Sequence, residues 1–267
     1  IVPLSLQVPG AAESKTEFLG IFANVFWKFA DTWEFSAGLR FDSQEIDVST
    51  ATAKPYTADE WQPRVTLTKH WSGDVMTYAS VARGFRGGGQ NGPGAPNPIY
   101  KGDSVWTYEL GSKSLLWDQK LALNAAVFYN DYSDFIGQNA LAPSTTGAGF
   151  VAINLNTGTV ESYGLELEAH LEATERFRVD GGLTLLHARI TDDSQFVATT
   201  GYGLPSDKIL FTPDWNYNLS GTYQLPLFEG RDVLEFTAGV VGKGARNGSG
   251  LALVDVGPIE MEAYHLV

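Results

Sequence analysis

The side chains that could do chemistry in this sequence are its histidines and its paired carboxylates. Asp192-Asp193 offers oxygens that suit Ca²⁺, but the spacing of an EF-hand is lacking, so a solvated acidic loop is expected. Glu166 and Glu168 share one strand face beside His170, yet paired carboxylates alone do not make an acid/base site. The histidines show no HExxH or other close metal-ligand spacing, and they lie at positions 70, 170, 187 and 265. We predict no catalytic residue, no metal site and no resident cofactor, and we expect the isolated histidines to be hydrogen-bonding groups inside the fold.

Other chemical motifs are incomplete or missing. Gly87, Gly88 and Gly89 are not followed by a helix or a P-loop lysine, so they do not form a phosphate cradle. The sequence contains no GxSxG elbow for a nucleophilic serine. Cysteine is absent, which excludes disulfides and thiolate metal sites. The net charge of −13, without any Lys/Arg-rich run, would repel phosphate backbones, so no nucleic-acid partner is expected.

Alternation of apolar and polar residues is the main structural pattern. From Trp33 to Asp42 every second residue is apolar, and the pattern recurs from Trp215 to Gln224 and from Leu165 to Glu172. A period of two predicts strands with one apolar and one polar face, about eleven in all, and we find no convincing helix. No stretch approaches the roughly 18 consecutive apolar residues of a transmembrane helix. If the chain crosses a membrane, it does so as a β-barrel.

The connections between these strands alternate in length. Tight turns are expected at Asp31-Thr32, Ser72 to Asp74, Asp118-Gln119, Glu175-Arg176 and Pro226 to Arg231. Long polar links are expected at roughly 49–60, 86–104, 137–158, 191–212 and 247–258. Short turns at one end and long loops at the other are typical of outer-membrane barrels, which have short periplasmic turns and long extracellular loops.

The seven tryptophans support a membrane setting, because membrane barrels carry aromatic girdles at both interfaces. Those beside short turns are Trp27, Trp33, Trp71 and Trp117, and those that follow long links are Trp61, Trp106 and Trp215. Trp61 and Trp71 bracket one strand, and about ten residues tilted by about 40° rise roughly 25 Å, the height of the apolar band. Trp106 has an even position and Trp117 an odd one, so on one regular strand their side chains would lie on opposite faces. This difference in parity predicts either a bulge between them or one inward-facing ring.

The stretch from Tyr78 to Asn91 (YASVARGFRGGGQN) carries a resemblance to a known family. This stretch resembles the end of a barrel strand in TonB-dependent receptors, with Gly84-Phe85-Arg86 and the next glycines matching the family pattern. Further stretches that are similar to family strands, in the expected order, are Phe35–Asp42 (FSAGLRFD), Trp106–Lys113 (WTYELGSK), Leu123–Tyr132 (LNAAVFYNDY) and Ser162–Glu168 (SYGLELE). The resemblance covers about residues 17–246.

The resemblance implies an all-β, antiparallel transmembrane β-barrel of 22 strands, plugged by an N-terminal globular domain. About eleven strands are seen here, so residues 1–267 would be a partial barrel domain. Glu17 to Ala30 would be near the tenth strand and Tyr264 to Val267 would begin the third-last. The plug, the TonB box and the remaining strands would be missing. An open edge strand is not viable in lipid, which also favours a fragment over a complete small barrel.

The implied function is uptake across the outer membrane of a Gram-negative bacterium. The receptor would capture a scarce nutrient complex, with ferric siderophores the commonest class and haem, cobalamin and oligosaccharides as other options. Its partners would be the TonB-ExbB-ExbD complex, outer-membrane lipid and lipopolysaccharide. Candidate ligand contacts in the loops and upper lumen are Arg83, Arg86, Gln90, Asn91, Tyr100 and Lys101. Alternatively, the two arginines pair with lumenal carboxylates or lipopolysaccharide, and Glu166 and Glu168 interact with plug or lumen arginines.

Other protein classes explain the sequence less well. A soluble β-sandwich has loops of mixed length at both ends, and a propeller needs a repeat of about 40 residues, which we do not find. A 10- to 12-stranded outer-membrane hydrolase could almost be completed by eleven strands, but it lacks a local catalytic motif. A passive porin would not explain the Gly84-Phe85-Arg86 segment and the matching neighbours.

Overall fold

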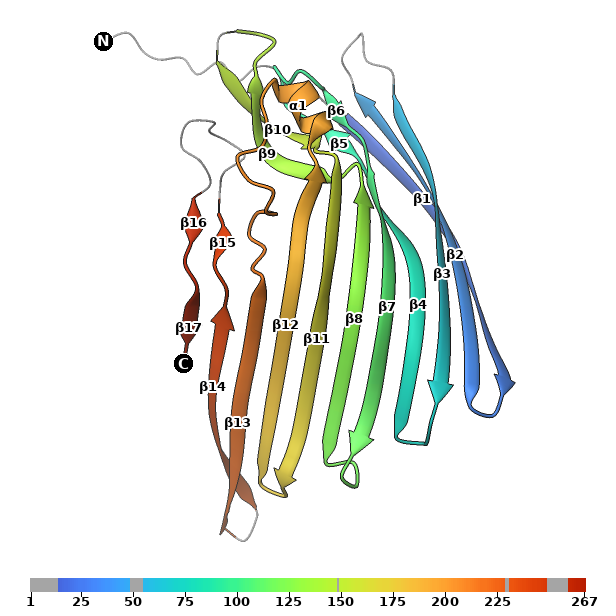
Figure 1. Cartoon of the computed structure of the whole chain (residues 1–267), viewed down its shortest axis with the longest axis vertical. Coiled ribbons are helices and arrows are strands. Elements are labelled where there is room, and N and C mark those ends of the chain that lie inside the picture. The colour runs from blue at the N-terminus through green and yellow to red at the C-terminus, as the bar shows by residue number, and fades with distance from the viewer. Residues whose placement is uncertain (1–13, 49–54, 148, 229–230, 249–258) are drawn as a thin grey trace.

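A computed structural model describes residues 14–48, 55–147, 149–228, 231–248 and 259–267. Most of them form one antiparallel sheet of eleven strands, in the order β1-β2-β3-β4-β7-β8-β11-β12-β13-β14-β17 (Figure 1). The strands are β1 Ser14–Ala30, β2 Trp33–Val48, β3 Tyr56–His70, β4 Val75–Arg86, β7 Asp103–Leu116, β8 Leu121–Ser133, β11 Thr159–Thr174, β12 Phe177–Asp192, β13 Trp215–Leu227, β14 Asp232–Lys243 and β17 Tyr264–Leu266. The prediction of an all-β antiparallel sheet with about eleven strands is confirmed.

The register divides the sheet into an apolar and a polar face. One apolar row runs across five strands through Leu67, Ala79, Leu110, Val127 and Leu165. Leu110 in this row is 59% exposed and Val127 is 48% exposed, so no part of the described chain covers them. We call this apolar side the outer face, because an exposed apolar band on a sheet is what lipid requires.

The opposite side carries mainly polar residues and is called the lumenal face. One of its rows joins Asn124, Glu168, Gly182 and Asn218 across four strands. Glu166, two residues from Glu168, belongs to the same face, as the alternation predicts. The two faces therefore arise from the period of two in the sequence, held in phase by an antiparallel ladder.

The short turns lie at one end of the sheet and the long connections at the other (Figure 1). The predicted turns at 31–32, 72–74, 118–119 and 175–176 all connect neighbouring strands directly. Strand β3 begins at Tyr56, so the long link predicted at 49–60 is shorter than expected. Strand β13 continues to Leu227, so the turn predicted at Pro226 to Arg231 is shorter as well. Parts of these two connections and of the link predicted at 247–258 lie outside the described residues, namely 49–54, 229–230 and 249–258.

The expectation of no helix is wrong at one place, where α1 (Ser194–Thr200) forms within the connection between β12 and β13. Seven residues are too few to show an amphipathic period in the sequence. The helix is stabilised by tertiary packing instead, since Phe196 is fully buried, and it ends at Gly201 with φ of 83°. Within the described ranges, no helix has the length and apolar character needed to cross a membrane.

The parity of Trp106 and Trp117 needs neither a bulge nor an inward ring. The β7–β8 register runs without a break from Ser104 paired with Ser133 to Leu116 paired with Leu121. Trp117 lies one residue beyond the end of β7, in a turn with φ of 53°, so strand parity does not apply to it. Both predicted alternatives are therefore wrong, because the turn was counted as strand.

Because the outer face meets lipid and the lumenal face does not, the same added charge should destabilise the protein more on the outer face. Leu219→Arg on β13 places a cation in lipid, while Asn218→Arg places one on the adjacent lumenal position. We expect the first change to cost about 2 to 4 kcal/mol of folding free energy, and the second to cost little. Folded fractions after refolding into liposomes, measured by heat-modifiable gel mobility, test this. Equal losses in both variants would contradict the assignment of the faces.

Candidate functional site

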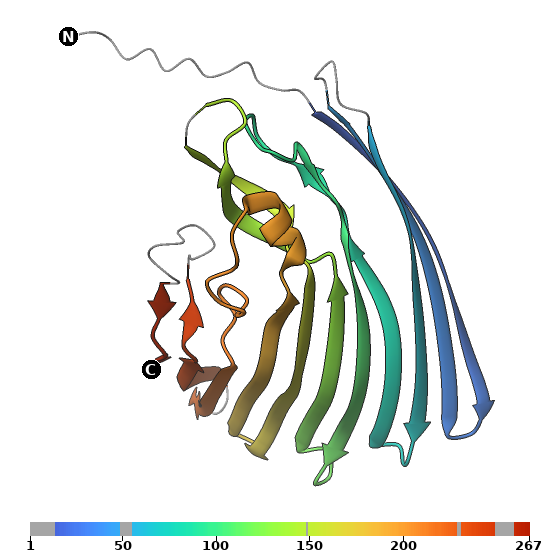
Figure 2. The ribbon, with the colours of Figure 1, turned by 45° about the horizontal axis from the view of Figure 1, so that its top comes forward.

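Three long connections gather at one end of the sheet and pack on one another, as Figure 2 shows from the side where that end comes forward. They contain the hairpin of β5 (Gly89–Gln90) with β6 (Ile99–Tyr100), the hairpin of β9 (Ile136–Pro143) with β10 (Phe150–Asn156), and helix α1. We call this assembly the loop cap. Its small apolar core consists of Ala140, Ala142, Ile153, Leu155 and Phe196.

The loop cap covers the upper part of the lumenal face rather than the outer face. Gln44, Ile46 and Val160 all have lumenal parity in the register, and all are buried. The Gln44 amide both donates to the carbonyl of Gly88 and accepts from its N–H, each at 2.9 Å. The long loops thus fold inward across the mouth of the lumen, which is where a ligand entering from outside would meet the protein.

Asp103 is the main anchor between the wall and the loop cap. Its carboxylate, only 5% exposed, accepts from Arg86 Nε at 3.1 Å, from Arg86 Nη2 and from the backbone N–H of Ile136 at 2.9 Å. Arg86 also donates to the Ile136 carbonyl at 3.3 Å and lies 5.5 Å from the centre of the Phe135 ring. A bidentate arginine–carboxylate pair therefore joins β4, β7 and the start of β9.

Two asparagines join the hairpins to each other. Asn91 donates to the Asn154 carbonyl at 2.7 Å and accepts from the Asn154 N–H at 2.8 Å. Asn156 makes the same paired contact with the backbone of Lys101, at 2.9 and 3.0 Å, and donates to the Asp134 carbonyl at 2.7 Å. These side chains satisfy backbone groups that the turns leave unpaired, so the cap is a connected body.

The structure separates the two arginines that the sequence singles out. Arg86 has lumenal parity, whereas Arg83 is in register with Trp106 on the outer face. Arg83 Nη1 lies 2.5 Å from the Glu60 carboxylate and donates to the Trp61 carbonyl at 2.8 Å. Both arginines are thus paired with carboxylates of the wall, as the alternative expects, and a ligand role for either stays a prediction.

The other predicted ligand contacts are divided between two hollows. The first, which we call the mouth pocket, has a volume of about 240 Å³ and is lined by Arg86, Phe135, Ile190, Lys208 and Phe211 among others. The second has a volume of about 340 Å³, and its lining includes the predicted Tyr100 and Lys101 together with Asp134, Asn156 and Gln195. The predicted Gln90 and Asn91 line neither of these two hollows, and Asn91 holds the cap together.

The mouth pocket combines positive charge with aromatic surface. Arg86, which is paired with Asp103, and Lys208, whose ammonium lies 4.0 Å from the Asp214 carboxylate, supply the cations, and Phe135 and Phe211 supply the rings. Phe211 is 61% exposed and has φ of 58°, a conformation that bulky residues rarely adopt. Such strain is concentrated at ligand-binding sites, where the surrounding structure maintains it. The arrangement suits an anionic ligand with flat apolar parts.

The sequence analysis does not single out Asp103, Phe135, Lys208 or Phe211. Asp103 could have been found, because it begins a strand whose partner ends at Arg86, which brings opposite charges to the same level. Lys208 and Phe211 gave no usable pattern, since they belong to an irregular connection and reach the mouth pocket only through tertiary packing.

Two of the histidines make contacts with neighbouring side chains of the wall. His170, on the lumenal face, lies 2.6 Å from Asp180 and 3.1 Å from Glu172, as expected of a hydrogen-bonding group. The expectation of an inward position is wrong for His187, which stacks on Tyr163 on the outer face with ring centres 4.9 Å apart. The described part of the chain contains no group of three or more His, Asp or Glu side chains that could hold a metal ion.

Removal of the Asp103 carboxylate should loosen the loop cap. Asp103→Ala loses charge-assisted hydrogen bonds worth about 1.5 to 3 kcal/mol, so the amide of Ile136 should exchange with deuterium about ten- to a hundredfold faster. Asp131→Ala, an exposed carboxylate with outer-face parity on β8, is the matched control and should leave that rate unchanged. Unchanged exchange in both variants would show that Asp103 is not the anchor.

The loop cap should also open in alkali. Burial raises the pKa of Tyr202, whose hydroxyl donates to the Leu141 carbonyl and whose ring meets Phe196 edge-on at 5.4 Å. Because the folded pKa exceeds the unfolded value of about 10, this stabilisation is complete below about pH 10 and is lost as the pH rises through the folded pKa. Subtilisin cleavage within β9–β10 should increase above pH 10 in the native receptor and much less in Tyr202→Phe. A parallel increase in both would argue against Tyr202.

Comparison with known proteins identifies the fold. Among curated proteins, a probable TonB-dependent siderophore receptor, PiuA of Acinetobacter baumannii, is 27% identical over 178 residues, which are 61% of this chain and 23% of the relative. Among solved structures, the ferric yersiniabactin uptake receptor FyuA of Yersinia pestis is 19% identical with a TM-score of 0.71, covering 94% of this chain and 37% of that one. The siderophore receptor PiuA of Acinetobacter baumannii gives 19% identity and a TM-score of 0.65, covering 94% and 36%.

The chain therefore spans about a quarter of the length of the curated relative that it matches. The sequence model described as "TonB dependent receptor-like, beta-barrel" matches residues 6–265, nearly the whole chain. This family consists of outer-membrane transport receptors of Gram-negative bacteria and not of enzymes. The chain belongs to the TonB-dependent receptor family and forms part of its outer-membrane β-barrel.

Proposed function

We propose that the receptor containing this chain binds a ferric siderophore at the cell surface and imports it with energy from TonB. The mouth pocket carries this proposal, because it presents Arg86 and Lys208 beside two phenylalanines on the lumenal side of the wall. Many ferric siderophore complexes are anionic and carry flat aromatic or hydroxamate groups, so cations and rings are complementary to them. The iron is cargo and not a resident cofactor of the protein.

The siderophore class has independent support from the relatives. The names of PiuA and FyuA refer to siderophore and ferric yersiniabactin uptake. In the ligand-bound state, Arg86 and Lys208 would contact the ligand directly, and Tyr100 and Lys101 would extend the contact over the neighbouring hollow. Gln90 and Asn91 would contribute by fixing the hairpins.

The proposed assembly is a 22-stranded barrel in which residues 1–267 form part of the wall. Strands β1 and β17 lie at the two edges of the described sheet, and open edges are not viable in lipid, so further strands would pair with both. A plug domain would fill the lumen and connect the receptor to the TonB-ExbB-ExbD complex. Lipopolysaccharide would surround the loop end of the wall, where Arg83 has outer-face parity.

The function is tested with the full-length receptor and a panel of ferric catecholate, hydroxamate and carboxylate siderophores. We expect saturable binding of at least one complex and uptake of radioactive iron that is lost in cells without TonB. Uptake independent of TonB, or no binding to any member of the panel together with normal folding, would contradict the proposal.

Substitution of Lys208 tests whether the mouth pocket binds the siderophore. Lys208→Gln should weaken binding of an anionic ferric siderophore about tenfold, because it removes one charge-assisted contact. Lys120→Gln, an equal charge change in the turn at the opposite end of the wall, should have no effect on the affinity. Arg83→Gln tests the prediction for Arg83 in the same assay. Equal affinity of the Lys208 variant and the native receptor would remove Lys208 from the site.

A further inference from the structure

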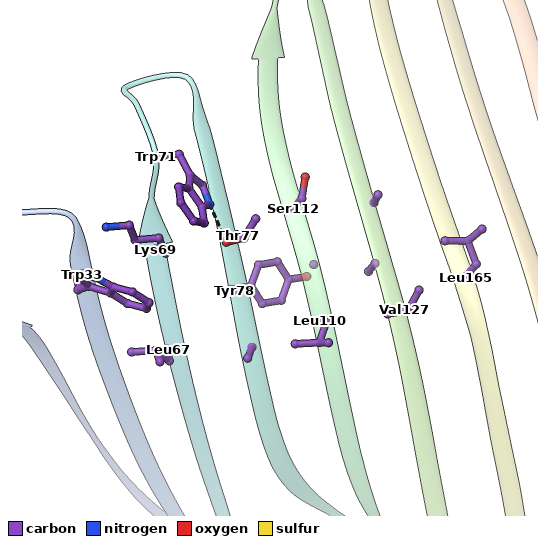
Figure 3. Close-up of a pocket in the computed structure, with 14 residues that line it drawn as sticks. Trp33, Leu67, Lys69, Trp71, Thr77, Tyr78, Leu110, Ser112, Val127 and Leu165 are labelled. Atoms are coloured by element: carbon purple, nitrogen blue, oxygen red, sulfur yellow. Dashed lines mark hydrogen bonds between the residues drawn. The ribbon is translucent and has the colours of Figure 1, made fainter.

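The outer face contains a hollow that the transport function does not use. Its volume is about 480 Å³, within the range of about 300 to 1,000 Å³ that is usual for small-molecule sites. The side chains around it that have outer-face parity include Trp33, Leu67, Leu110, Val127 and Leu165 (Figure 3). It therefore faces the hydrocarbon of the membrane and not the lumen.

The hollow lies where small side chains occupy the middle of one outer-face row. The row begins at Lys69 and continues through the smaller side chains of Thr77, Ser112 and Ala125. The next row contains Leu67, Leu110, Val127 and Leu165. Small residues next to branched ones leave a furrow in a surface that is otherwise evenly apolar.

This hollow, which we call the furrow, extends from the edge of the membrane toward the middle of the bilayer. Lys69 is next to the last residue of β3, beside a short turn, whereas Val127 and Leu165 lie near the middle of β8 and β11. Figure 3 shows Trp71 and Lys69 near the turn that follows β3, with Leu165 across the sheet from them on β11. The furrow is therefore cationic at its rim end and apolar along its length.

At the rim end, neighbouring side chains hold Lys69 in place, so that it presents one positive charge. The Lys69 ammonium lies 4.9 Å from the centre of the Trp33 ring and 5.6 Å from that of Trp71, and it donates to Thr32 Oγ1 at 2.6 Å. The Trp71 indole is itself held by Thr77 Oγ1 at 3.0 Å. No carboxylate of the described chain forms an ion pair with Lys69, so two of its three N–H donors are available.

We propose that this furrow binds one glycerophospholipid of the periplasmic leaflet. The phosphate would accept hydrogen bonds from Lys69, with the indoles at the level of the headgroup, and one acyl chain would lie in the furrow toward Leu165. A phospholipid is the occupant because short turns mark the periplasmic side of such barrels, and phospholipid forms that leaflet. Lipopolysaccharide has negative charge as well, but it occupies the opposite leaflet.

The test uses the full-length receptor, extracted in mild detergent and examined by native mass spectrometry with phosphatidylglycerol as the probe. Lys69→Gln removes the headgroup contact, and Ala79→Phe fills the furrow from an exposed outer-face position. We expect Lys69→Gln to lower occupancy about fivefold and Ala79→Phe to abolish it. Lys120→Gln and Ala238→Phe are the matched controls, at the same end of the wall and on the same face, and should retain the lipid.

Two results would overturn the assignment. Equal lipid retention by all five proteins would show that the bound lipid is only the annular shell. Retention of lipopolysaccharide instead of phosphatidylglycerol, lost in the same two variants, would place a different lipid in the furrow. Iron uptake is measured in parallel, and because the furrow lies on the outer face, normal uptake in Lys69→Gln is expected under the proposal.

Discussion

The structure depends on one constraint, which is that no backbone N–H or C=O can remain unpaired in lipid. An antiparallel ladder satisfies this constraint for strands, and it forces side chains to alternate between two environments. The long, continuous registers from β2 through β14 show the consequence, with few irregularities and with apolar rows on one side and polar rows on the other. The chain has almost no buried core in the wall itself, because lipid takes the place of one.

The loop cap follows a different rule, since water surrounds it and its backbone groups cannot form a long ladder. It is stabilised by a small apolar core around Phe196 and by side chains that bond to backbone, chiefly Asp103, Asn91 and Asn156. Gly158, with φ of 143°, passes so close to the backbone of Asp192 that a side chain there would collide with it. These contacts hold the loop cap against the ends of the wall strands, so the mouth pocket lies between the two. Ligand selectivity can then vary in the loops while the barrel stays the same.

The sequence predicts the wall well and the loop cap poorly, for the same physical reason. Alternation over ten or more residues is a strong local pattern, so eleven strands, their short turns and the two faces could be predicted. Helix α1 and the short hairpins depend on contacts between connections that are distant in sequence, such as Asn91 with Asn154. Trp117 shows that alternation does not locate the ends of strands, because this residue lies in the turn after β7. Lys208 reaches the mouth pocket through an irregular segment, which no periodicity reveals.

We propose that this chain is part of the wall of a plugged, TonB-dependent transport barrel. Cryo-electron microscopy of the native receptor, incubated with a ferric siderophore, tests it most directly by counting strands and locating the ligand. We expect 22 strands around a plug, with the complex bound at the mouth beside Arg86 and Lys208. A closed, unplugged barrel of ten to twelve strands, with an open lumen, would contradict it.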